Sequence, residues 1–435
     1  MLSAAAVRDD ASYFAELRAR EFARLDEQHH AYLDYTGSAL YAESQLDAHR
    51  ELLRHGLFGN PHSDSAPSRA STEVIEQMRA RVLRHFDVDA STHAVIFTAN
   101  TSAAIKLVAE SYPFTPRLSC VLSADNHNSV NGIREYAVRA HAHVCYIPLD
   151  DELRMREPRE RLARERGGLF AFPAQSNFSG VQHPLSLIDD AHALGFDVLL
   201  DMAAYAPSHV LSLRAHAADF AALSFYKAFG FPTGIGALIA RREALAKLRR
   251  PWFAGGTVLY ASVNARTHRL RASHEAFEDG TPDFLGIAAI ESGLDLLESA
   301  QLHDLTAHVK RLTHVLLDGL RAMPHVRIYG PMDLTNRGGT IAFNVDGLPY
   351  WDVEARAREC GISIRGGCFC NPGASEQAFG LRDAAPCLDR LGDAFTPARF
   401  AACAQTAVGA VRVSPGLANH ADDVRRLLAL VAALA

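Results

Sequence analysis

Seven short apolar segments in the first two-thirds of the chain constrain its fold more than any other feature. They are AVIFT (94–98), SCVLS (119–123), HVCYIP (143–148), GLFAFP (168–173), DVLLD (197–201), AALSFY (221–226) and GALIA (236–240). Several are apolar at both odd and even positions, which is typical of strands covered on both faces. Longer helical patterns lie between them, such as residues 72–86. This alternation predicts an α/β domain with a mostly parallel sheet that binds ligands at the carboxyl ends of its strands.

The pattern changes after about residue 282. Two helical stretches, 285–300 and 302–323, precede strand-like segments and a last helix. The strand-like segments are TIAFNV (340–345), ISIR (362–365) and AVRVSP (410–415). The change predicts a smaller α+β domain at the C-terminal end. We therefore expect an N-terminal helical segment over 1–30 that packs with the small domain, a large domain over 31–282, and the small domain over 283–435.

Composition excludes several classes of protein. The chain has 435 residues, of which 48% are apolar and 22% charged, with a net charge of −6. This composition is typical of a globular protein, and the mildly acidic balance argues against a nucleic-acid partner. No signal-peptide core is found in MLSAAAVRDD, and no apolar run approaches the ~18 residues that cross a bilayer. The seven cysteines are an odd number in a long chain and do not indicate a secreted disulfide framework. We expect a cytoplasmic protein without a membrane or nucleic-acid partner.

Lysine is rare in this chain, which narrows the search for a reactive amine. The four lysines are Lys106, Lys227, Lys247 and Lys310. Lys227 follows a predicted strand and precedes a glycine-rich turn, whereas the other three lie in helical patterns and are expected in solvent. A lysine at a strand end can be an ordinary exposed residue at the edge of the sheet. In a cleft, however, desolvation lowers its pKa and suits it to covalent chemistry with a carbonyl group.

Three further features follow predicted strands. Asp201 closes DVLLD, where it is either a helix cap or a carboxylate that keeps a pyridine nitrogen protonated. Asn100, Thr101 and Ser102 lead from AVIFT into a helix, where they form either an ordinary cap or a phosphate site. His127 follows another strand, as a polar loop residue or as a ring that stacks on a flat cofactor. Taken together, the amine, carboxylate, phosphate site and stacking group describe pyridoxal phosphate.

A set of longer stretches carries a family resemblance. It includes YLDYTGSALY (32–41), VIFTANTSAAIKLVAE (95–110), FAFPAQSNFSGVQHPL (170–185), SFYKAFGFPTGIGALIA (224–240) and IRGGCFCNPGA (364–374). In this order the stretches resemble the class V aminotransferase-like, fold-type I pyridoxal phosphate enzymes. The resemblance is to the cysteine desulfurase branch, and most closely to the N-terminal domain of molybdenum cofactor sulfurases. It implies a large, mostly parallel seven-stranded-sheet domain and a smaller α+β C-terminal domain.

The resemblance also implies roles for the residues around the cofactor. Lys227 binds pyridoxal phosphate covalently and later moves the α-proton of the substrate. Asp201 pairs with the pyridine nitrogen, and His127 stacks on the ring. The other cofactor-binding residues are Asn100, Thr101, Ser102 and Ser224, of which the last three hold the phosphate.

Three more residues receive roles in the same way. Asn177 contacts the cofactor or the substrate, and Arg412 binds the substrate carboxylate with its planar fork of donors. In dimeric relatives the segment around Thr281 reaches the phosphate of the neighbouring subunit, which implies a homodimer.

A cysteine pair, Cys368 and Cys370, lies in RGGCFCNPG. The glycine, asparagine and proline around it indicate an exposed loop rather than a buried turn, and a metal site would need about four clustered ligands. In desulfurases a cysteine on a mobile loop takes the sulfur as a persulfide, which requires an accessible thiol. The resemblance places Cys370 at that position, with Cys368 as the alternative or as a relay. Cys120, Cys145 and Cys360 lie in or beside apolar runs and are expected in the core.

Three positions depart from the family pattern, and two of them, Ala204 and Ser375, keep other reactions open. Ala204 stands where many desulfurases have glutamine, Tyr226 where suf-type enzymes have histidine, and Ser375 where sulfurases commonly carry a third cysteine. Our leading hypothesis is a cysteine desulfurase or sulfurtransferase that converts L-cysteine to L-alanine and passes sulfur to a protein or small-molecule acceptor. The alternatives are another class V enzyme (a C–S or C–Se lyase, an epimerase or a specialised biosynthetic enzyme) and a non-catalytic partner protein that keeps the fold.

Overall fold

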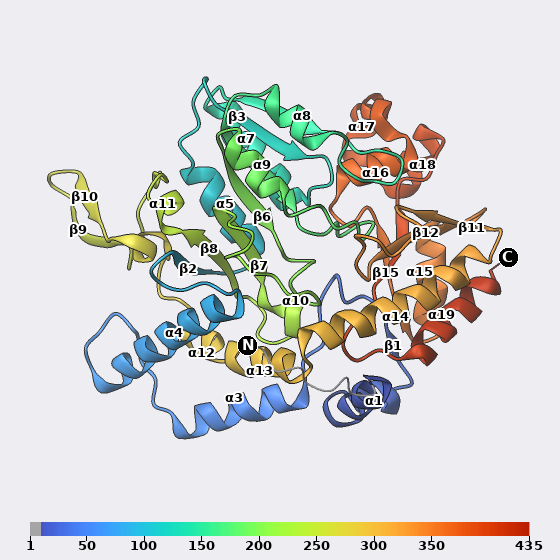
Figure 1. Ribbon diagram of the computed structural model, residues 1–435, viewed down its shortest axis with the longest axis horizontal. Coiled ribbons are helices and arrows are strands. Elements are labelled where there is room, and N and C mark those ends of the chain that lie inside the picture. Colours follow the sequence, from blue (N-terminus) through green and yellow to red (C-terminus); the bar gives the residue numbers. More distant parts are fainter. Residues whose placement is uncertain (1–9, 435) are drawn as a thin grey trace.

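The computed structural model describes residues 10–434, and a seven-stranded sheet lies at its centre (Figure 1). In spatial order the strands are β2 (His93–Thr98), β8 (Gly236–Arg241), β7 (Phe220–Ser224), β6 (Phe196–Asp201), β5 (Gly168–Pro173), β3 (Ser119–Ser123) and β4 (His143–Ile147). Neighbouring strands are parallel except at β8, which runs antiparallel to both β7 and β2. Each of the seven predicted apolar segments is therefore a strand of one mostly parallel sheet.

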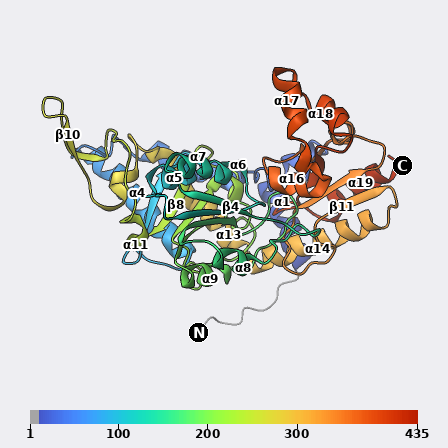
Figure 2. The ribbon, with the colours of Figure 1, turned by 90° about the horizontal axis from the view of Figure 1, so that it is seen from above.

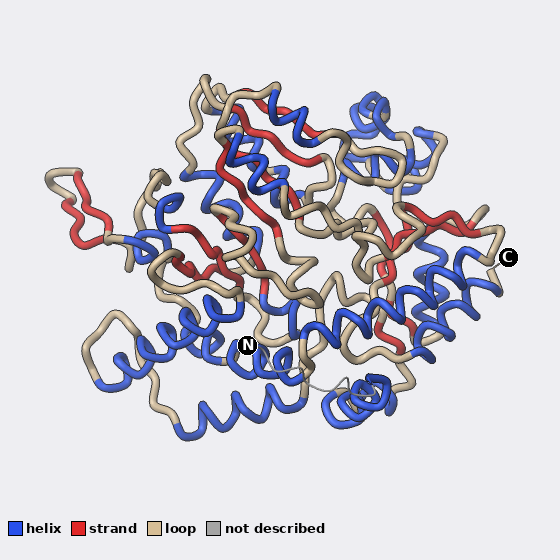
Figure 3. Tube along the Cα trace, in the orientation of Figure 1, coloured by secondary structure: helices blue, strands red, loops and turns tan. Residues whose placement is uncertain are grey.

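Helices cover both faces of this sheet, which explains why its strands are apolar at successive positions. One face packs against α5 (Thr101–Ser111), α6 (Asn128–Asn131) and α7 (Ile133–Arg139). The other face packs against α4 (Ala66–His85), α8 (Pro158–Ala163), α9 (Leu187–Ala193) and α13 (Ile290–Ser299). In β2, for example, Ile96 is buried in the first layer and Val95 in the second. Figure 3 shows the strands in red with the helices around them.

A second, four-stranded sheet follows in the C-terminal part. Its antiparallel strands are, in spatial order, β11 (Val326–Tyr329), β12 (Ile341–Val345), β15 (Ala410–Val413) and β14 (Arg365–Gly367). The helices α14 (Leu302–Arg321), α15 (Tyr350–Glu359) and α19 (Ala421–Ala432) share a hydrophobic core with it. The stretch predicted as one helix over 285–300 is divided between α12 (Phe284–Ala288) and α13.

The predicted strand ISIR is wrong in its extent, because it forms two strands in different sheets. β13 (Ile362–Ser363) pairs in parallel with β1 (Ala31–Tyr32), whereas β14 begins at Arg365 and joins the four-stranded sheet. A strand of four residues in sequence thus changes partners between Ser363 and Arg365, which no local pattern can indicate.

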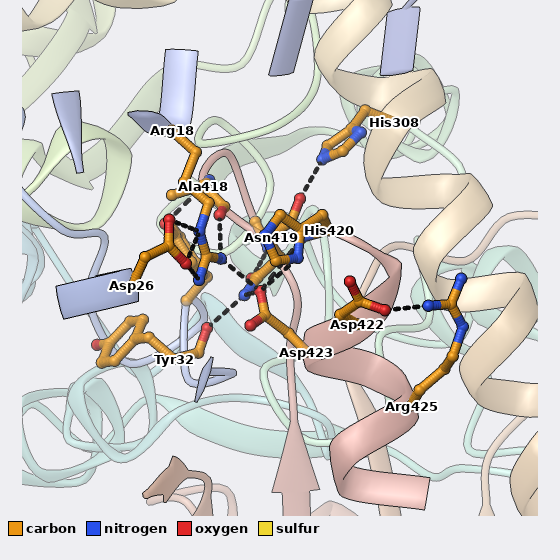
Figure 4. Close-up of polar contacts among 12 residues, drawn as sticks. Arg18, Asp26, Tyr32, His308, Ala418, Asn419, His420, Asp422, Asp423 and Arg425 are labelled. Atoms are coloured by element: carbon orange, nitrogen blue, oxygen red, sulfur yellow. Dashed lines mark hydrogen bonds and ion pairs between the residues drawn. The ribbon is translucent and has the colours of Figure 1, made fainter. Parts of the chain in front are cut away.

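An ion-pair network, buried at Arg18 and Asp423, joins the N-terminal helix α1 (Asp10–Glu21) to α19 (Figure 4). Arg18 pairs with Asp423 at 2.6 Å and with Asp26, in α2 (Arg24–Glu27), at 2.7 Å. The side-chain amide of Asn419 donates to Asp423 at 2.9 Å and to the carbonyl oxygen of Tyr32 at 2.9 Å. The two ends of the described chain are therefore held together by buried charges. The domain boundaries at 30 and 282 stay a prediction, and residues 1–9 of the first segment lie outside the described residues.

The remaining elements complete the fold. They are α3 (Glu43–His55), α10 (Phe225–Phe229), α11 (Arg242–Leu245), α16 (Pro372–Phe379), α17 (Ala385–Leu391), α18 (Pro397–Ala404) and the short 3-10 helices at Ser273–Phe277, Leu381–Asp383 and Gly392–Ala394. A hairpin that was not predicted, β9 (Val258–Ser262) and β10 (Thr267–Leu270), projects from the body (Figure 2). A disulfide between Cys387 and Cys403 joins α17 to α18, although the cysteine count does not indicate a disulfide framework. Within residues 10–434 no helix has the length and apolar character needed to cross a membrane.

Candidate active site

A cavity of about 320 Å³ opens at the carboxyl ends of the strands of the large sheet. Its wall is made by the segments that follow β2, β3, β5, β6 and β7, because parallel strands end at one common edge. The predicted residues in its lining are Asn100, Thr101, Ser102, His127, Asn177, Asp201, Ser224 and Lys227. The structure therefore brings together, in one cavity, most of the residues singled out in the sequence.

Hydroxyl groups gather where α5 begins. The side chain of Asn100 accepts a backbone hydrogen bond from the first turn of α5 at 3.0 Å and so caps the helix. Thr101 donates its backbone N–H to Ser224 Oγ at 2.8 Å, and the two hydroxyls lie 2.7 Å apart. The hydroxyls of Ser102 and Ser129 lie 2.5 Å apart. The helix dipole and these hydroxyls together suit the binding of a phosphate group.

Lys227 lies in the short helix α10, not at the end of an extended strand as the sequence predicts, because the chain turns helical at Phe225. Burial lowers the pKa of the Lys227 amine. The carboxylate of Asp201 opposes this shift and Arg412 adds to it. A buried lysine with a lowered pKa has the unprotonated amine that covalent chemistry requires.

The other three lysines are exposed, as predicted. Lys106 in α5 pairs with Glu110 at 2.9 Å, and Lys247, just past α11, pairs with Asp197 at 2.5 Å. Lys310 lies on an exposed position of α14. None of the three lines the cavity.

Asp201 and His127 lie on the cavity wall with polar atoms in defined positions. One oxygen of Asp201 accepts the backbone N–H of Ala203 at 3.0 Å, and the second has no hydrogen-bond partner among the described residues. His127 Nδ1 accepts the backbone N–H of Ser129 at 3.1 Å. Burial lowers the pKa of His127, against the opposing charge of Asp201, and so favours the neutral ring.

The cysteine loop lies against this cavity. Cys368 and Cys370 are exposed, as predicted, whereas Phe369 between them is buried. The carbonyl oxygen of Cys370 accepts the backbone N–H of Asn128 at 2.7 Å, and that of Phe369 accepts the side-chain amide of Asn177 at 2.7 Å. A negative charge on Cys370 opposes the lowering of the Lys227 pKa.

Arg412, on β15, is almost fully buried beside the cysteine loop. Its guanidinium donates to Asp34 Oδ1 at 2.8 Å and to the carbonyl oxygen of Asn177 at 3.1 Å. Arg365 pairs with the second oxygen of Asp34 at 2.6 Å. The buried Nε of Arg412 has no hydrogen-bond partner among the described residues. Arg412 is not among the residues that line the cavity, so its role in binding a carboxylate stays a prediction.

Thr281 does not join the other predicted residues. It is exposed and lines a neighbouring cavity of about 400 Å³, which shares Ala99 and Gly234 with the first. Its hydroxyl accepts a hydrogen bond from the amide of Asn60 at 3.4 Å. Thr281 therefore does not line the main cavity.

Sequence reasoning missed some contributors and misplaced one cysteine. Asp34 and Gln175 were not predicted as site residues. The signal for Asp34 was an acidic residue within YLDYTG, and the signal for Gln175 was a polar residue just after β5. Cys120 is buried, as predicted, and burial raises its pKa to about 12. Cys145 is half-buried, and Cys360 is exposed because it follows the last turn of α15 at the surface, so its assignment to the core is wrong.

The chemistry of this lining fits pyridoxal phosphate. The unpartnered oxygen of Asp201 suits a protonated pyridine nitrogen, the hydroxyls at the start of α5 suit the phosphate, and the Lys227 amine suits the aldehyde. A cavity of about 320 Å³ has the size of a small-molecule site.

Comparison with known proteins agrees with this geometry. Two relatives are human molybdenum cofactor sulfurase, 36% identical with 96% of this chain and 51% of that protein aligned, and molybdenum cofactor sulfurase 3 of Aedes aegypti, 35% identical with 95% and 57% aligned. The chain spans about half the length of these relatives. Among solved structures, a cysteine desulfurase from Thermococcus onnurineus NA1 matches with a TM-score of 0.83 and 25% identity, over 96% of this chain and 97% of that one. The Escherichia coli cysteine desulfurase CsdA matches the fold with a TM-score of 0.78, 22% identity and 98% of each chain covered.

The model of the aminotransferase class-V family matches residues 31–427, which include both sheets and every residue of the site. With its mostly parallel seven-stranded sheet and the lysine beside its carboxyl edge, the chain belongs to the aminotransferase class-V family.

Proposed function

We propose that the chain is a pyridoxal phosphate-dependent cysteine desulfurase, which converts L-cysteine to L-alanine and passes the sulfur through Cys370 to an acceptor. The observation that carries this proposal is the attachment of the cysteine loop to the Lys227 cavity by the hydrogen bonds from Asn128 and Asn177. The names of the relatives, which are sulfurases and cysteine desulfurases, support the same reaction.

The residues at the sheet edge bind and orient the cofactor. Thr101, Ser102 and Ser224 hold its phosphate at the start of α5, and Asp201 holds its ring nitrogen in the protonated form. His127 covers the ring as a neutral imidazole. When bound, pyridoxal phosphate supplies an electron sink for bond breaking at the amino acid.

The remaining groups act on the substrate. Arg412 binds the carboxylate of L-cysteine with its guanidinium, which the ion pair with Asp34 holds in place. Lys227, whose pKa burial lowers, takes the α-proton. Cys370 attacks the sulfur atom of the substrate as a thiolate, so that an S–S bond forms while the C–S bond breaks. The balance is L-cysteine plus the Cys370 thiol giving L-alanine plus the Cys370 persulfide.

The test is product analysis with purified enzyme loaded with pyridoxal phosphate. Without a reductant, L-cysteine should give about one alanine per site and a persulfide that mass spectrometry locates on Cys370. With dithiothreitol, alanine and sulfide should form continuously. The variant Cys370→Ser should retain the bound cofactor but form no persulfide, and the matched control Cys368→Ser should keep the first turnover. Absence of both alanine and sulfide from the wild type would refute the proposal.

Thr281 supports a homodimer as part of this proposal. Its exposed position outside the main cavity is where a residue could reach the phosphate of a second subunit, as the family resemblance implies. Sedimentation of the loaded enzyme should give twice the mass of the chain, and Thr281→Val should weaken retention of pyridoxal phosphate. A monomer with full cofactor retention in the variant would contradict the assignment. The acceptor, a protein or a small thiol, takes the sulfur at the exposed loop.

A further inference from the structure

Asp125 has a carboxylate that is completely buried directly beneath the cysteine loop. One oxygen accepts from Ser176 Oγ at 2.7 Å and from the amide of Asn371 at 2.8 Å. The other accepts from His183 Nε2 at 2.9 Å. Among the described residues neither lysine nor arginine pairs with it. A buried carboxylate is unfavourable unless its oxygens are all hydrogen-bonded, so this arrangement is strongly specified.

Asn371, the residue after Cys370, links this carboxylate to the loop. Its amide nitrogen donates to Asp125 and also to Asn177 Oδ1 at 3.0 Å. Its oxygen accepts the backbone N–H of Ala374 at 3.2 Å and so caps α16. One buried side chain therefore fixes both the end of the cysteine loop and the start of the helix that follows.

The backbone of the loop needs such support. Phe369 and Cys370 both have a φ of 56°, in the left-handed region that side chains other than glycine rarely adopt. Residues persist in this region when the surrounding structure determines their conformation. The backbone bond to Asn128 and the Asn177 amide hold the carbonyl groups of the two residues, and Asn371 holds the next position.

We propose that Asp125, with His183 behind it, is the positioning residue of the cysteine loop, and that its hydrogen bond to Asn371 sets the direction of the Cys370 thiol. The role assigned to Cys370 rests on the proposed desulfurase function. The geometric part does not, because a loop orientation is measurable without turnover.

The experiment exchanges the hydrogen-bond donor and acceptor between Asn371 and Asp125. Asn371→Asp keeps the oxygen that caps α16 but sets two carboxylates against each other. Asp125→Asn in the same chain restores a donor and an acceptor across this contact, while its remaining oxygen still accepts from His183. The readouts are the alkylation rate of Cys370 by iodoacetamide relative to Cys368, resolved by peptide mass spectrometry, and the separate kcat and KM for sulfide formation.

A matched control is Asn419→Asp. Asn419 also donates its amide to a buried carboxylate, that of Asp423, at 2.9 Å, but it lies in the α19 network of Figure 4. This variant reports the general loss of stability that a buried asparagine-to-aspartate change causes. It should leave the ratio of Cys370 to Cys368 alkylation at the wild-type value.

We expect Asn371→Asp to change the alkylation ratio by on the order of tenfold, because thiol reactivity follows its surroundings. Its kcat should fall on the order of 100-fold, as a displacement of about 1 Å does at a reacting centre, with a smaller effect on KM. The double variant should recover part of both losses, because it restores the contact with residue 125 but not the donor to Asn177 Oδ1. The proposal is overturned if Asn371→Asp and Asn419→Asp have the same ratio of Cys370 to Cys368 alkylation. It is also overturned if the double variant has the same alkylation ratio and kcat as Asn371→Asp alone.

A second pair keeps the test decisive if Asn371→Asp does not fold. His183→Gln retains an N–H donor toward Asp125 and should keep the wild-type ratio of Cys370 to Cys368 alkylation. His183→Leu removes the donor and should shift this ratio in the direction expected for Asn371→Asp. Equal, wild-type ratios in both variants overturn the proposal. If the wild type forms no alanine, the desulfurase function fails, and the alkylation ratios still decide the positioning role.

Discussion

His209 should make the free energy of unfolding fall as the pH falls, and the substitution His209→Gln should remove this contribution. Its Nε2 accepts a hydrogen bond from the side chain of Gln182 at 2.8 Å, and Gln182 in turn donates to Gln175, which lines the cofactor cavity. Burial lowers the pKa of His209 to about 4, from 6.5 in an unfolded chain. Between these values the unfolded chain binds more protons, so the free energy of unfolding falls as the pH falls.

The magnitude follows from the two pKa values. Each pKa unit of difference corresponds to about 1.4 kcal/mol in the free energy of unfolding. The neutral His209 therefore costs the folded protein about 3 kcal/mol of this free energy once the pH is below 4. About 2 kcal/mol of it is lost between pH 7.5 and pH 5. His209→Gln retains a hydrogen-bond acceptor for Gln182 but does not titrate.

The assay is urea unfolding of the wild type and of His209→Gln at both pH values. The wild type should lose about 2 kcal/mol more between pH 7.5 and pH 5 than the variant does. The exposed His55→Gln serves as the control and should lose as much as the wild type. Equal pH dependence in the wild type and in His209→Gln would refute the reasoning.

Three further results are expected. Lys227→Ala should bind pyridoxal phosphate without a covalent bond, so gel filtration should remove the visible absorbance that the wild type retains. Arg18→Met should lower the free energy of unfolding by about 3–5 kcal/mol in urea, because it removes the arginine that pairs with the buried carboxylate of Asp423. Gly373→Ala should lower the melting temperature, because a Cβ at this position would lie 2.1 Å from the carbonyl oxygen of Ala124 and the packing could adjust only at a cost of about 1–3 kcal/mol.

The large sheet could be predicted from the sequence because burial on both faces leaves a local signal. Val95 and Ile96 are neighbours that face opposite layers, so the segment around them is apolar throughout. The antiparallel direction of β8 has no such signal. The hairpin of β9 and β10 was missed because its strands are largely exposed and therefore lack the apolar pattern.

The site residues at strand ends were accessible to the same reasoning, since Lys227 and Asp201 follow apolar segments directly. The residues that support the cysteine loop could not be found by this reasoning. Asp125 and His183 lie 58 residues apart, and neither has a pattern that distinguishes it from a surface residue. Asp34 is also invisible locally, because its significance comes from Arg412, 378 residues away. Pairings over such distances depend on the completed fold.

The network of Arg18 and Asp423 has a consequence for how the protein is made. These residues are 405 positions apart, so at about 5–20 residues per second a ribosome needs on the order of 20–80 s to add the second after the first. During that interval the strands of the large sheet, which lie between residues 93 and 241, are already available for pairing. Helix α1 and strand β1 must wait for α19 and β13, their charged and apolar groups still exposed. Until α19 is made, Arg18 lacks its partner Asp423, so the contact between α1 and α19 forms only after the strands of the large sheet have been synthesised.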